Sequence, residues 1–251
     1  MRRYGLSDSE WDQIKNLLPG RSETVGVTAK DNRLFVEAIL YRYRTGIPWR
    51  DLPARFGNYR SVHMRHSRWS RKGVWEKIFQ VLSTHSDNTY TMIDSTIVKA
   101  HQHSAGAKKK RKRQSIGRSS GGWSSKIHVI CDGQGKPTAL HLTAGNSHDL
   151  VGSDALLMQI QSTTLIADKA YYARDRFIEK LKARKCKVVI PPKVNSKTEK
   201  KYDKIIYKRR HLIENFFAKL KQFRAIATRY DKTAKIFLGA IHLVASLSWT
   251  I

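Results

Sequence analysis

Four side chains in the last quarter of the chain combine a phenol, two cations and a carboxylate at helical spacing. Tyr207, Arg210, Glu214 and Lys221 follow one another at offsets of three, four and seven residues. At roughly 100° per residue, a helix places all four within about 60° of one another. Such a face suits phosphodiester chemistry, but spaced Glu and Lys residues also form ordinary ion pairs on solvated helices. The rest of the chain must decide between these interpretations.

Two further acids lie in apolar stretches that have the composition of strands. Asp94 interrupts the β-branched run 90–98, and Asp168 ends the short apolar run 163–168. A carboxylate in such a strand is costly unless its charge is compensated, and a cation is the simplest partner. Together with Glu214, the two aspartates can hold Mg²⁺ or Mn²⁺ through oxygen ligands. Two such ions would activate the attacking oxygen and stabilise the leaving oxygen of a phosphodiester.

The charge balance of the chain favours a polyanionic partner. Its 251 residues include 48 Lys and Arg against 20 Asp and Glu, which gives a net charge of +28. Such an excess opposes compaction and attracts nucleic acid. A membrane role is disfavoured, because there is no long apolar run, lipidation signature or signal-peptide pattern. We expect a soluble cytoplasmic protein that binds DNA and no membrane.

The two cysteines, Cys131 and Cys186, each lie in an apolar, strand-like stretch. Neither has a histidine at the spacing of a zinc ligand. We therefore expect two buried, reduced thiols, with no disulfide and no zinc site.

The chain up to about residue 86 has the periodicity of short helices, expected over roughly 7–18, 31–43, 61–72 and 74–82. Helices of this length with short connections fit a helix-turn-helix type module. The third helix is rich in basic residues, so Arg65 and Arg68 are candidate DNA contacts. It could equally be a solvated helix that shares the overall charge.

Beyond residue 88 the pattern changes to strands alternating with helices. The expected order is strand 90–98, hairpin strands 123–131 and 138–143, helix 154–160, strand 163–168, helix 174–184, strand 187–190 and the long helix that carries Glu214. This order indicates an α/β fold with a mixed sheet, in which the first strand pairs with the hairpin. Asp94 and Asp168 are then on neighbouring strands. A last apolar helix, about 233–249, is expected to pack on the sheet or on a second subunit.

A polybasic run separates the first strand from the hairpin. It includes Lys109, Lys110 and Arg111 and is followed by a Gly- and Ser-rich segment, 115–122. Such a run either stays solvated or contacts DNA phosphates, and the sequence leaves both possibilities open.

Several different short motifs follow one another along the whole chain. They are Gly46-Ile47-Pro48-Trp49-Arg50-Asp51-Leu52-Pro53, Ile93-Asp94-Ser95-Thr96, Lys126-Ile127-His128, His148-Asp149, Ala167-Asp168-Lys169 with Tyr171, and Tyr207 through Arg210-His211-Leu212-Ile213-Glu214 to Lys221. With these motifs the chain resembles bacterial insertion-sequence transposases of the DDE class, specifically the IS-five family.

The resemblance implies a small all-helical module at residues 1–86 and an RNase H-like DDE catalytic domain with a C-terminal helix at 87–251. It also implies that Asp94, Asp168 and Glu214 are the catalytic, metal-binding acids. By the same analogy, Arg210 and Lys221 contact DNA phosphates near the cut, and Tyr207 positions the strand end. The histidines and the aspartate of the shorter motifs would orient loops.

The implied function is that of a transposase. It would bind the terminal inverted repeats of its element, cleave the ends and join the 3′-hydroxyl to target DNA, acting as a homodimer at the bacterial nucleoid. Two alternatives remain: a metal-dependent nuclease that cuts without joining, and a DNA-binding repressor with an inactive core.

Overall fold

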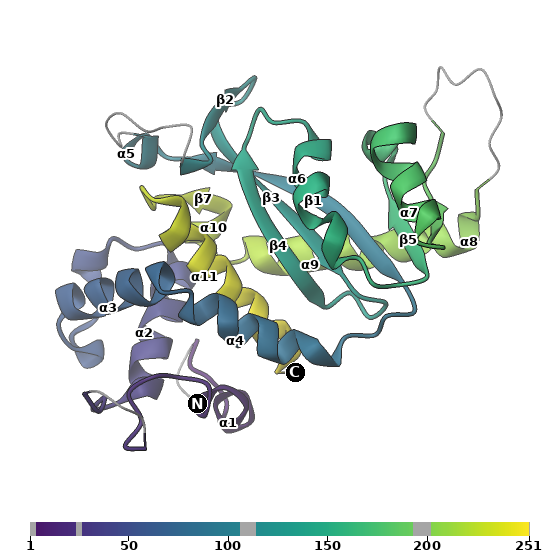
Figure 1. Cartoon of the computed structure of the whole chain (residues 1–251). Coiled ribbons are helices and arrows are strands. Elements are labelled where there is room, and N and C mark those ends of the chain that lie inside the picture. The colour runs from purple at the N-terminus through teal and green to yellow at the C-terminus, as the bar shows by residue number, and fades with distance from the viewer. Residues whose placement is uncertain (1–3, 24–26, 106–113, 193–201, 251) are drawn as a thin grey trace. The chain divides into compact units, whose positions relative to one another are not determined.

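The structure is a computed structural model that describes residues 4–23, 27–105, 114–192 and 202–250 (Figure 1). The chain forms two compact units. The first comprises Met1–Thr84, His101–Ala107 and Leu220–Ile251, and the second His85–Ala100 and Lys108–Lys219. The C-terminal segment, which the family analogy assigns to the catalytic domain, therefore packs with the N-terminal helices.

The first unit is built from amphipathic helices with clear local signals at their ends. The Ser7 side chain accepts from the Glu10 N–H, and the Glu10 carboxylate accepts from the Ser7 N–H, which forms a capping box. Gly46 ends the second helix with a φ of 78°, a left-handed conformation that favours glycine. The helices are α1 (Asp8–Lys15), α2 (Asn32–Thr45), α3 (Tyr59–Arg71) and α4 (Val74–Leu82), with 3₁₀ turns at Trp49–Asp51, Ala54–Phe56 and Ser83–His85. The four predicted helices are confirmed.

Aromatic rings fill the core of the first unit. The ring centroids of Phe35 and Trp69 lie 5.1 Å apart, as do those of Trp69 and Trp75. The C-terminal helix α11 (Ala234–Ser246) completes this core. A Cβ on its Gly239 would lie 2.5 Å from the Ser70 hydroxyl, so α11 approaches α3 and α4 closely. The sequence led us to expect α11 on the sheet or on a second subunit; within its own unit, its apolar face meets α3 and α4.

The remaining elements of the first unit are short. They are α5 (Gln102–Ala105), α10 (Arg224–Ala227), β7 (Thr228–Arg229) and a 3₁₀ turn at Leu247–Trp249. A buried polar network links this segment to α2 and α3. The Tyr43 hydroxyl donates to Asp231 Oδ2 at 2.9 Å and lies 3.2 Å from His66 Nε2. Burial lowers the pKa of His66 to about 3, so the imidazole is neutral and can accept a hydrogen bond.

The second unit contains a mixed sheet. Its strands are β1 (Thr91–Ala100), β2 (Gly117–Ser119), β3 (Gly122–Cys131), β4 (Pro137–Ala144), β5 (Thr164–Ala167) and β6 (Lys187–Val189). Strands β3 and β4 form the predicted hairpin, and β3 runs antiparallel to β1. On its other side, β1 pairs in parallel with β5, which pairs in parallel with β6. The RNase H-like mixed sheet expected from the sequence is confirmed.

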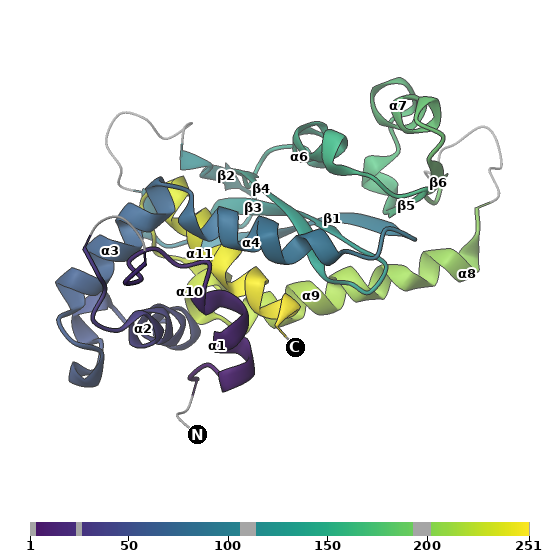
Figure 2. The same cartoon turned by 60° about the horizontal axis from the view of Figure 1, so that its bottom comes forward.

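Helices cover both faces of this sheet (Figure 2). Helices α6 (Asp149–Leu156) and α7 (Glu179–Ala183) lie on one side, and α9 (His211–Lys221) lies on the other. A π-helical turn, Arg174–Ile178, precedes α7, while α8 (Lys204–Tyr207) and a 3₁₀ turn, Lys208–Arg210, lead into α9. Helix α6 starts before its predicted range because His148 caps it: the imidazole Nδ1 accepts from the Leu150 N–H at 3.2 Å.

Both cysteines of the second unit are buried and free, as predicted. Cys186 packs in the apolar core between the sheet and the helices α6 and α7, and Cys131 ends β3. Burial raises the pKa of each thiol, which keeps both sulfurs protonated and unreactive.

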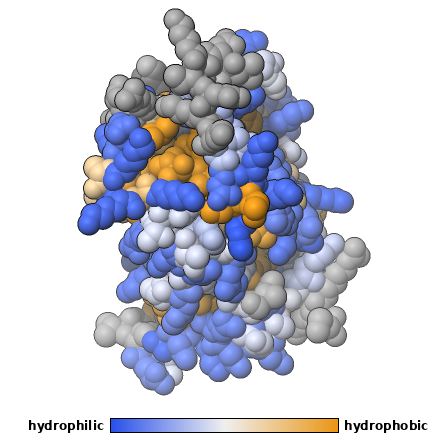
Figure 3. Space-filling model, turned by 90° about the vertical axis from the view of Figure 1, so that its right-hand side faces the viewer, coloured by the Kyte–Doolittle hydropathy of each residue, from blue (hydrophilic) through white to orange (hydrophobic). Residues whose placement is uncertain are grey.

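Among the described residues, no helix is long and apolar enough to cross a membrane. The face shown in Figure 3 is mostly hydrophilic, and apolar residues show between hydrophilic ones, chiefly in its upper half. Ile205, at the start of α8, is among the most exposed large apolar residues of the chain.

Candidate active site

Two aspartates lie at equivalent positions of neighbouring parallel strands: Asp94 is within β1, and Asp168 directly follows the last residue of β5. In the pairing of β1 with β5, Ile93 lies opposite Ala167, so the next residues, Asp94 and Asp168, follow at the same level. Asp168 leaves the strand and caps the turn Lys169–Tyr171, where its Oδ1 accepts from the Ala170 N–H at 2.8 Å. The prediction that the two acids belong to neighbouring strands is confirmed by the pairing of β1 with β5, although β5 ends one residue before Asp168.

Arg210 connects the helix acid to the first strand acid. Its Nη1 donates to Asp94 Oδ2 at 2.6 Å, and its Nη2 donates to the Glu214 carboxylate. Because Glu214 follows Arg210 by about one helical turn, both side chains leave the helix on the same face. The Asp94 side chain is only 15% exposed, whereas that of Glu214 is 52% exposed.

The Asp94 carboxyl group has an unusual protonation equilibrium. Burial raises its pKa to about 6, and the charges of Asp168 and Asp149 act in the same direction. The hydrogen bond from the Ser95 N–H and the charge of Arg210 oppose this rise. The balance means that the negative charge of Asp94 is incompletely compensated, and an additional cation would be favourable.

The chemistry of the three acids fits a hard divalent cation, because carboxylate oxygens are its preferred ligands. Within the described part of the chain, no three His, Cys, Asp or Glu side chains converge into a ready-made metal site. The guanidinium group of Arg210 instead bridges Asp94 and Glu214. The Glu214 side chain is half exposed, so one side of its carboxylate faces solvent.

The other two members of the helical signature lie on the same segment. Tyr207 is half buried, and its ring packs edge-on against Tyr202 with centroids 5.4 Å apart. Burial raises the pKa of Tyr207, and the charges of Asp168 and Asp94 add to this effect, so the phenol lies within electrostatic reach of both acids. Lys221 is exposed at the end of α9, two turns beyond Glu214.

The predicted DNA contacts of the third helix fall into two groups. The Arg65 guanidinium lies 4.1 Å from the Phe35 ring centroid and 4.6 Å from that of Trp69, and it also donates to Asn32. Arg65 is thus half-buried, with its guanidinium group engaged by residues of the first unit. Arg68, by contrast, is exposed on α3. The candidates Lys109, Lys110 and Arg111 lie outside the described residues.

The predicted contact Arg68 belongs to an exposed stripe on α3 that the sequence did not identify as a whole. Arg60, Met64, Arg68 and Arg71 are all exposed, and the Met64 side chain is 61% exposed. Their spacing of three or four residues places them along one face. Helix α3 contains no acidic residue. The spacing is visible in the sequence, but only the packing of the opposite face shows which residues point outward.

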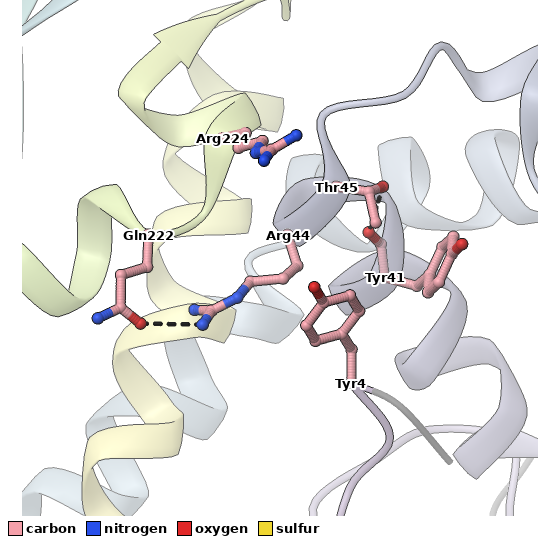
Figure 4. Close-up of a pocket in the computed structure, with 6 residues that line it drawn as sticks. All are labelled: Tyr4, Tyr41, Arg44, Thr45, Gln222 and Arg224. Carbon is pink, nitrogen blue, oxygen red and sulfur yellow. Dashed lines mark hydrogen bonds between the residues drawn. The ribbon is translucent and has the colours of Figure 1, made fainter.

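A basic hollow of about 510 Å³ lies within the first unit (Figure 4). It is lined by Tyr4, Tyr41, Arg44, Thr45, Gln222 and Arg224. The Arg44 guanidinium donates to Gln222 Oε1 at 2.9 Å and stacks over Tyr4 and Phe223. With two arginines and no acid in its lining, the hollow attracts anions.

Several motif residues without an assigned role gather on the face of the sheet that α6 covers. The Ser95 hydroxyl donates to Asp149 Oδ1 at 2.5 Å, and Lys126 Nζ lies 3.0 Å from the same oxygen. Sequence reasoning assigned Asp149 only to orienting a loop. The motif itself was visible, but its contact with β1 depends on how α6 docks.

Comparisons with known proteins agree with this geometry. The family described as the transposase DDE domain matches residues 85–249, and the family of IS4/5 transposases (DUF4096) matches residues 6–79. An uncharacterised protein of Sinorhizobium fredii, y4sN, is 45% identical over 105 residues, covering 42% of this chain and 84% of its own length. A Brucella ovis protein named as a transposase for insertion sequence element IS6501 is 36% identical over 129 residues, covering 50% of this chain and 97% of its own length.

A third relative is a Burkholderia cepacia protein of insertion element IS402. It is 30% identical over 107 residues, which cover 38% of this chain and 73% of the relative. The match to the DDE domain spans more than half of the present chain and includes all three acids. The chain therefore belongs to the DDE transposases of the IS4/5 family of insertion sequences.

Proposed function

We propose that this transposase binds the terminal inverted repeats of its own element, cleaves the element ends and joins the freed 3′-hydroxyl to target DNA. The observation that carries this proposal is the meeting of Asp94, Arg210 and Glu214, with Asp168 on the adjacent strand. Two acids joined by an arginine, with a third acid directly after the adjacent strand, would provide the ligands and the phosphate-binding fork that both steps require.

DDE transposases depend on a divalent cation, and the carboxylates of Asp94, Asp168 and Glu214 would hold it. We propose Mg²⁺ or Mn²⁺, bound as two ions. Such ions, when bound, polarise the phosphodiester and lower the pKa of the attacking water. The chain itself would supply the orientation of the site. One carboxylate within a strand, one directly after a strand and one on a helix would fix the directions from which the DNA can approach.

Arg210 has a second role in this scheme. Its planar guanidinium group matches a phosphate as well as it matches a carboxylate. When DNA enters, Arg210 would exchange its bonds with Asp94 and Glu214 for bonds to a phosphate oxygen near the cut. Lys221 would contact a phosphate further along the strand, and Tyr207 would support the strand end. Positioning and charge neutralisation of this kind lower the barrier to phosphoryl transfer.

The helical module would recognise the inverted repeats through the exposed stripe of α3. An α-helix fits the major groove, where arginines bind phosphates or guanine edges and an apolar side chain contacts a thymine methyl group. Arg60, Arg68 and Arg71 have the first chemistry, and Met64 has the second. Lys109, Lys110 and Arg111 remain proposed phosphate contacts, and Arg65 would act through packing.

We further propose that two copies act together on DNA at the bacterial nucleoid, in the cytoplasm. Each element has two ends, and both must be cut and joined in concert. One copy offers one set of three acids, so a homodimer would provide one site for each end.

The test uses a labelled DNA fragment that contains one end of the element. This fragment includes the DNA next to the transposase gene and the boundary at which the element stops. Wild-type protein is incubated with this fragment and a supercoiled target, with and without Mn²⁺. We expect metal-dependent cleavage at the boundary followed by joined products. Cleavage without joining would support a nuclease, and binding without cleavage would support a repressor. Asp154→Asn is the matched control, because Asp154 is a partly exposed carboxylate of α6 that pairs with Arg176.

A further inference from the structure

A polar cluster lies directly behind Asp94, on the opposite face of the sheet. Successive residues of a strand point to opposite faces, so Asp94 faces α9, and Ser95 faces α6. Ser95 lies opposite His128 of β3, and Lys126 is two residues away on the same face. Asp149, in the first turn of α6, reaches into this group. Residues of three separate sequence motifs therefore meet at one point of the fold.

The contacts within the cluster are short and specific. Lys126 is buried, and its Nζ donates to the Ser147 carbonyl oxygen at 2.7 Å and lies 3.0 Å from Asp149 Oδ1. The Ser95 hydroxyl donates to the same Asp149 oxygen at 2.5 Å. Burial acts to raise the pKa of Asp149, but the bonds from Ser95 and Lys126 outweigh it and lower the pKa. The carboxylate is therefore ionised and committed to these two donors.

Helix α6 is held close to the sheet by a glycine. A Cβ on Gly152 would lie 2.2 Å from the His128 ring, so only glycine permits this approach. Burial lowers the pKa of His128 to about 4, and its Nε2 lies 2.8 Å from the Thr143 hydroxyl. The neutral histidine thus forms a fixed surface against which α6 rests. This docking is what brings Asp149 within reach of Ser95.

We propose that Lys126 and Asp149 are positioning residues for Asp94, acting through the hydroxyl of Ser95. The ion pair fixes Asp149, Asp149 fixes the Ser95 side chain, and the Ser95 N–H donates to Asp94 Oδ1 at 2.7 Å. The backbone that sets the direction of the Asp94 carboxylate is thereby restrained from the far side of the sheet. Partners behind metal ligands orient them in this way, and their loss weakens metal binding by about 10- to 100-fold. The inference rests on the proposed role of Asp94 as a metal ligand.

Two simpler explanations make different predictions. A purely structural ion pair would affect folding stability and leave cation binding unchanged. A purely electrostatic effect would have opposite signs for the two charges: loss of Asp149 would weaken cation binding, and loss of Lys126 would strengthen it. Positioning predicts weaker binding in both cases, because either change releases Ser95.

Ser95→Ala is the most direct test, because it cuts the link and leaves the Lys126–Asp149 pair in place. The full-length protein is compared with Ser95→Thr, which keeps a hydroxyl, and with Ser125→Ala. Ser125 is a buried serine of β3 whose hydroxyl donates to the Ser115 carbonyl oxygen at 2.6 Å. Free Mn²⁺ is measured by electron paramagnetic resonance to obtain the dissociation constant. Hydrogen exchange of residues 91–100 reports the order of β1 without metal, and circular dichroism reports folding.

We expect Ser95→Ala to melt within a few degrees of wild type, to exchange faster in residues 91–100 and to bind Mn²⁺ at least about tenfold more weakly. Ser95→Thr and Ser125→Ala should match wild type, and Lys126→Met should also weaken Mn²⁺ binding. If Ser95→Ala bound Mn²⁺ as tightly as wild type, or if Lys126→Met bound it more tightly, the positioning role would be overturned. The proposed metal site would still stand in that case, because the wild-type protein would bind Mn²⁺. If the wild-type protein bound no Mn²⁺, the proposed metal site would fall, and this inference with it.

Discussion

Asp94→Asn is expected to stabilise the second unit at neutral pH when divalent cations are removed. The pKa of the Asp94 carboxyl group is raised from 3.8 to about 6, so folding favours its neutral form. A shift of about two units corresponds to at most about 3 kcal/mol of unfolding free energy, at about 1.4 kcal/mol per unit. Solvent screening removes little of this, since the side chain is 15% exposed. Asparagine has the shape of the neutral form and carries no charge to desolvate.

The pH dependence follows from the sign of the shift. Between about pH 4 and pH 6 the folded protein holds a proton on Asp94 that the unfolded chain releases. The stability contributed by this group is therefore complete below about pH 4 and is lost as the pH rises through 6. The advantage of Asp94→Asn over wild type should be largest above pH 6 and should close as the pH falls to about 4. For the same reason, the Mn²⁺ affinity of wild type should fall below about pH 6.

The assay is native-state hydrogen exchange of residues 91–100 in EDTA, which reports the opening free energy of β1 in the second unit alone. Added Mn²⁺ should stabilise wild type by mass action and leave Asp94→Asn unchanged. Asp154→Asn should behave like wild type in every condition, because Asp154 is partly exposed and makes its ion pair with Arg176 on the surface. A lower opening free energy for Asp94→Asn than for wild type at pH 7.5 in EDTA would refute the reasoning.

Three further substitutions test the packing and the DNA-binding surface. Gly152→Ala should destabilise the second unit by about 1 to 3 kcal/mol, since the added Cβ would lie 2.2 Å from the His128 ring. Thermal melting compares this variant with Gly121→Ala, whose added Cβ would meet nothing within 4 Å. Arg65→Ala should lower the melting temperature, because its guanidinium group stacks on two aromatic rings. Arg68→Ala should leave melting unchanged but reduce the slope of log affinity for duplex DNA against log salt by about one. A normal salt slope for Arg68→Ala would remove α3 from the DNA interface.

Local patterns in the sequence predict the parts of the site that depend on one element. The spacing of Arg210 and Glu214 is enough to place both on one helix face, and the structure brings them together there. The order of strands and helices is enough to predict that Asp94 and Asp168 lie on neighbouring strands. Both inferences use periodicity and connection rules, which need no knowledge of packing.

Other features depend on packing between distant segments and could not be predicted in this way. The charge of Arg65 suggested a DNA contact, but its stacking on Phe35 and Trp69 follows from how α2 meets α3. The apolar face of α11 identified a buried helix without identifying its partners. Asp149 reaches Ser95 only because Gly152 lets α6 approach the sheet. In each case the residue type was informative, and the neighbour was decided by tertiary contacts.

Joining of a precut element end tests the central claim most directly. A duplex with a free 3′-hydroxyl at the element boundary bypasses cleavage, so the product of strand transfer into a plasmid reports the acid site alone. Wild type and Asp154→Asn should give joined product in Mn²⁺, and Asp168→Asn should give none while still binding the duplex. Joining by Asp168→Asn at the wild-type rate would contradict the assignment of the three acids to phosphoryl transfer.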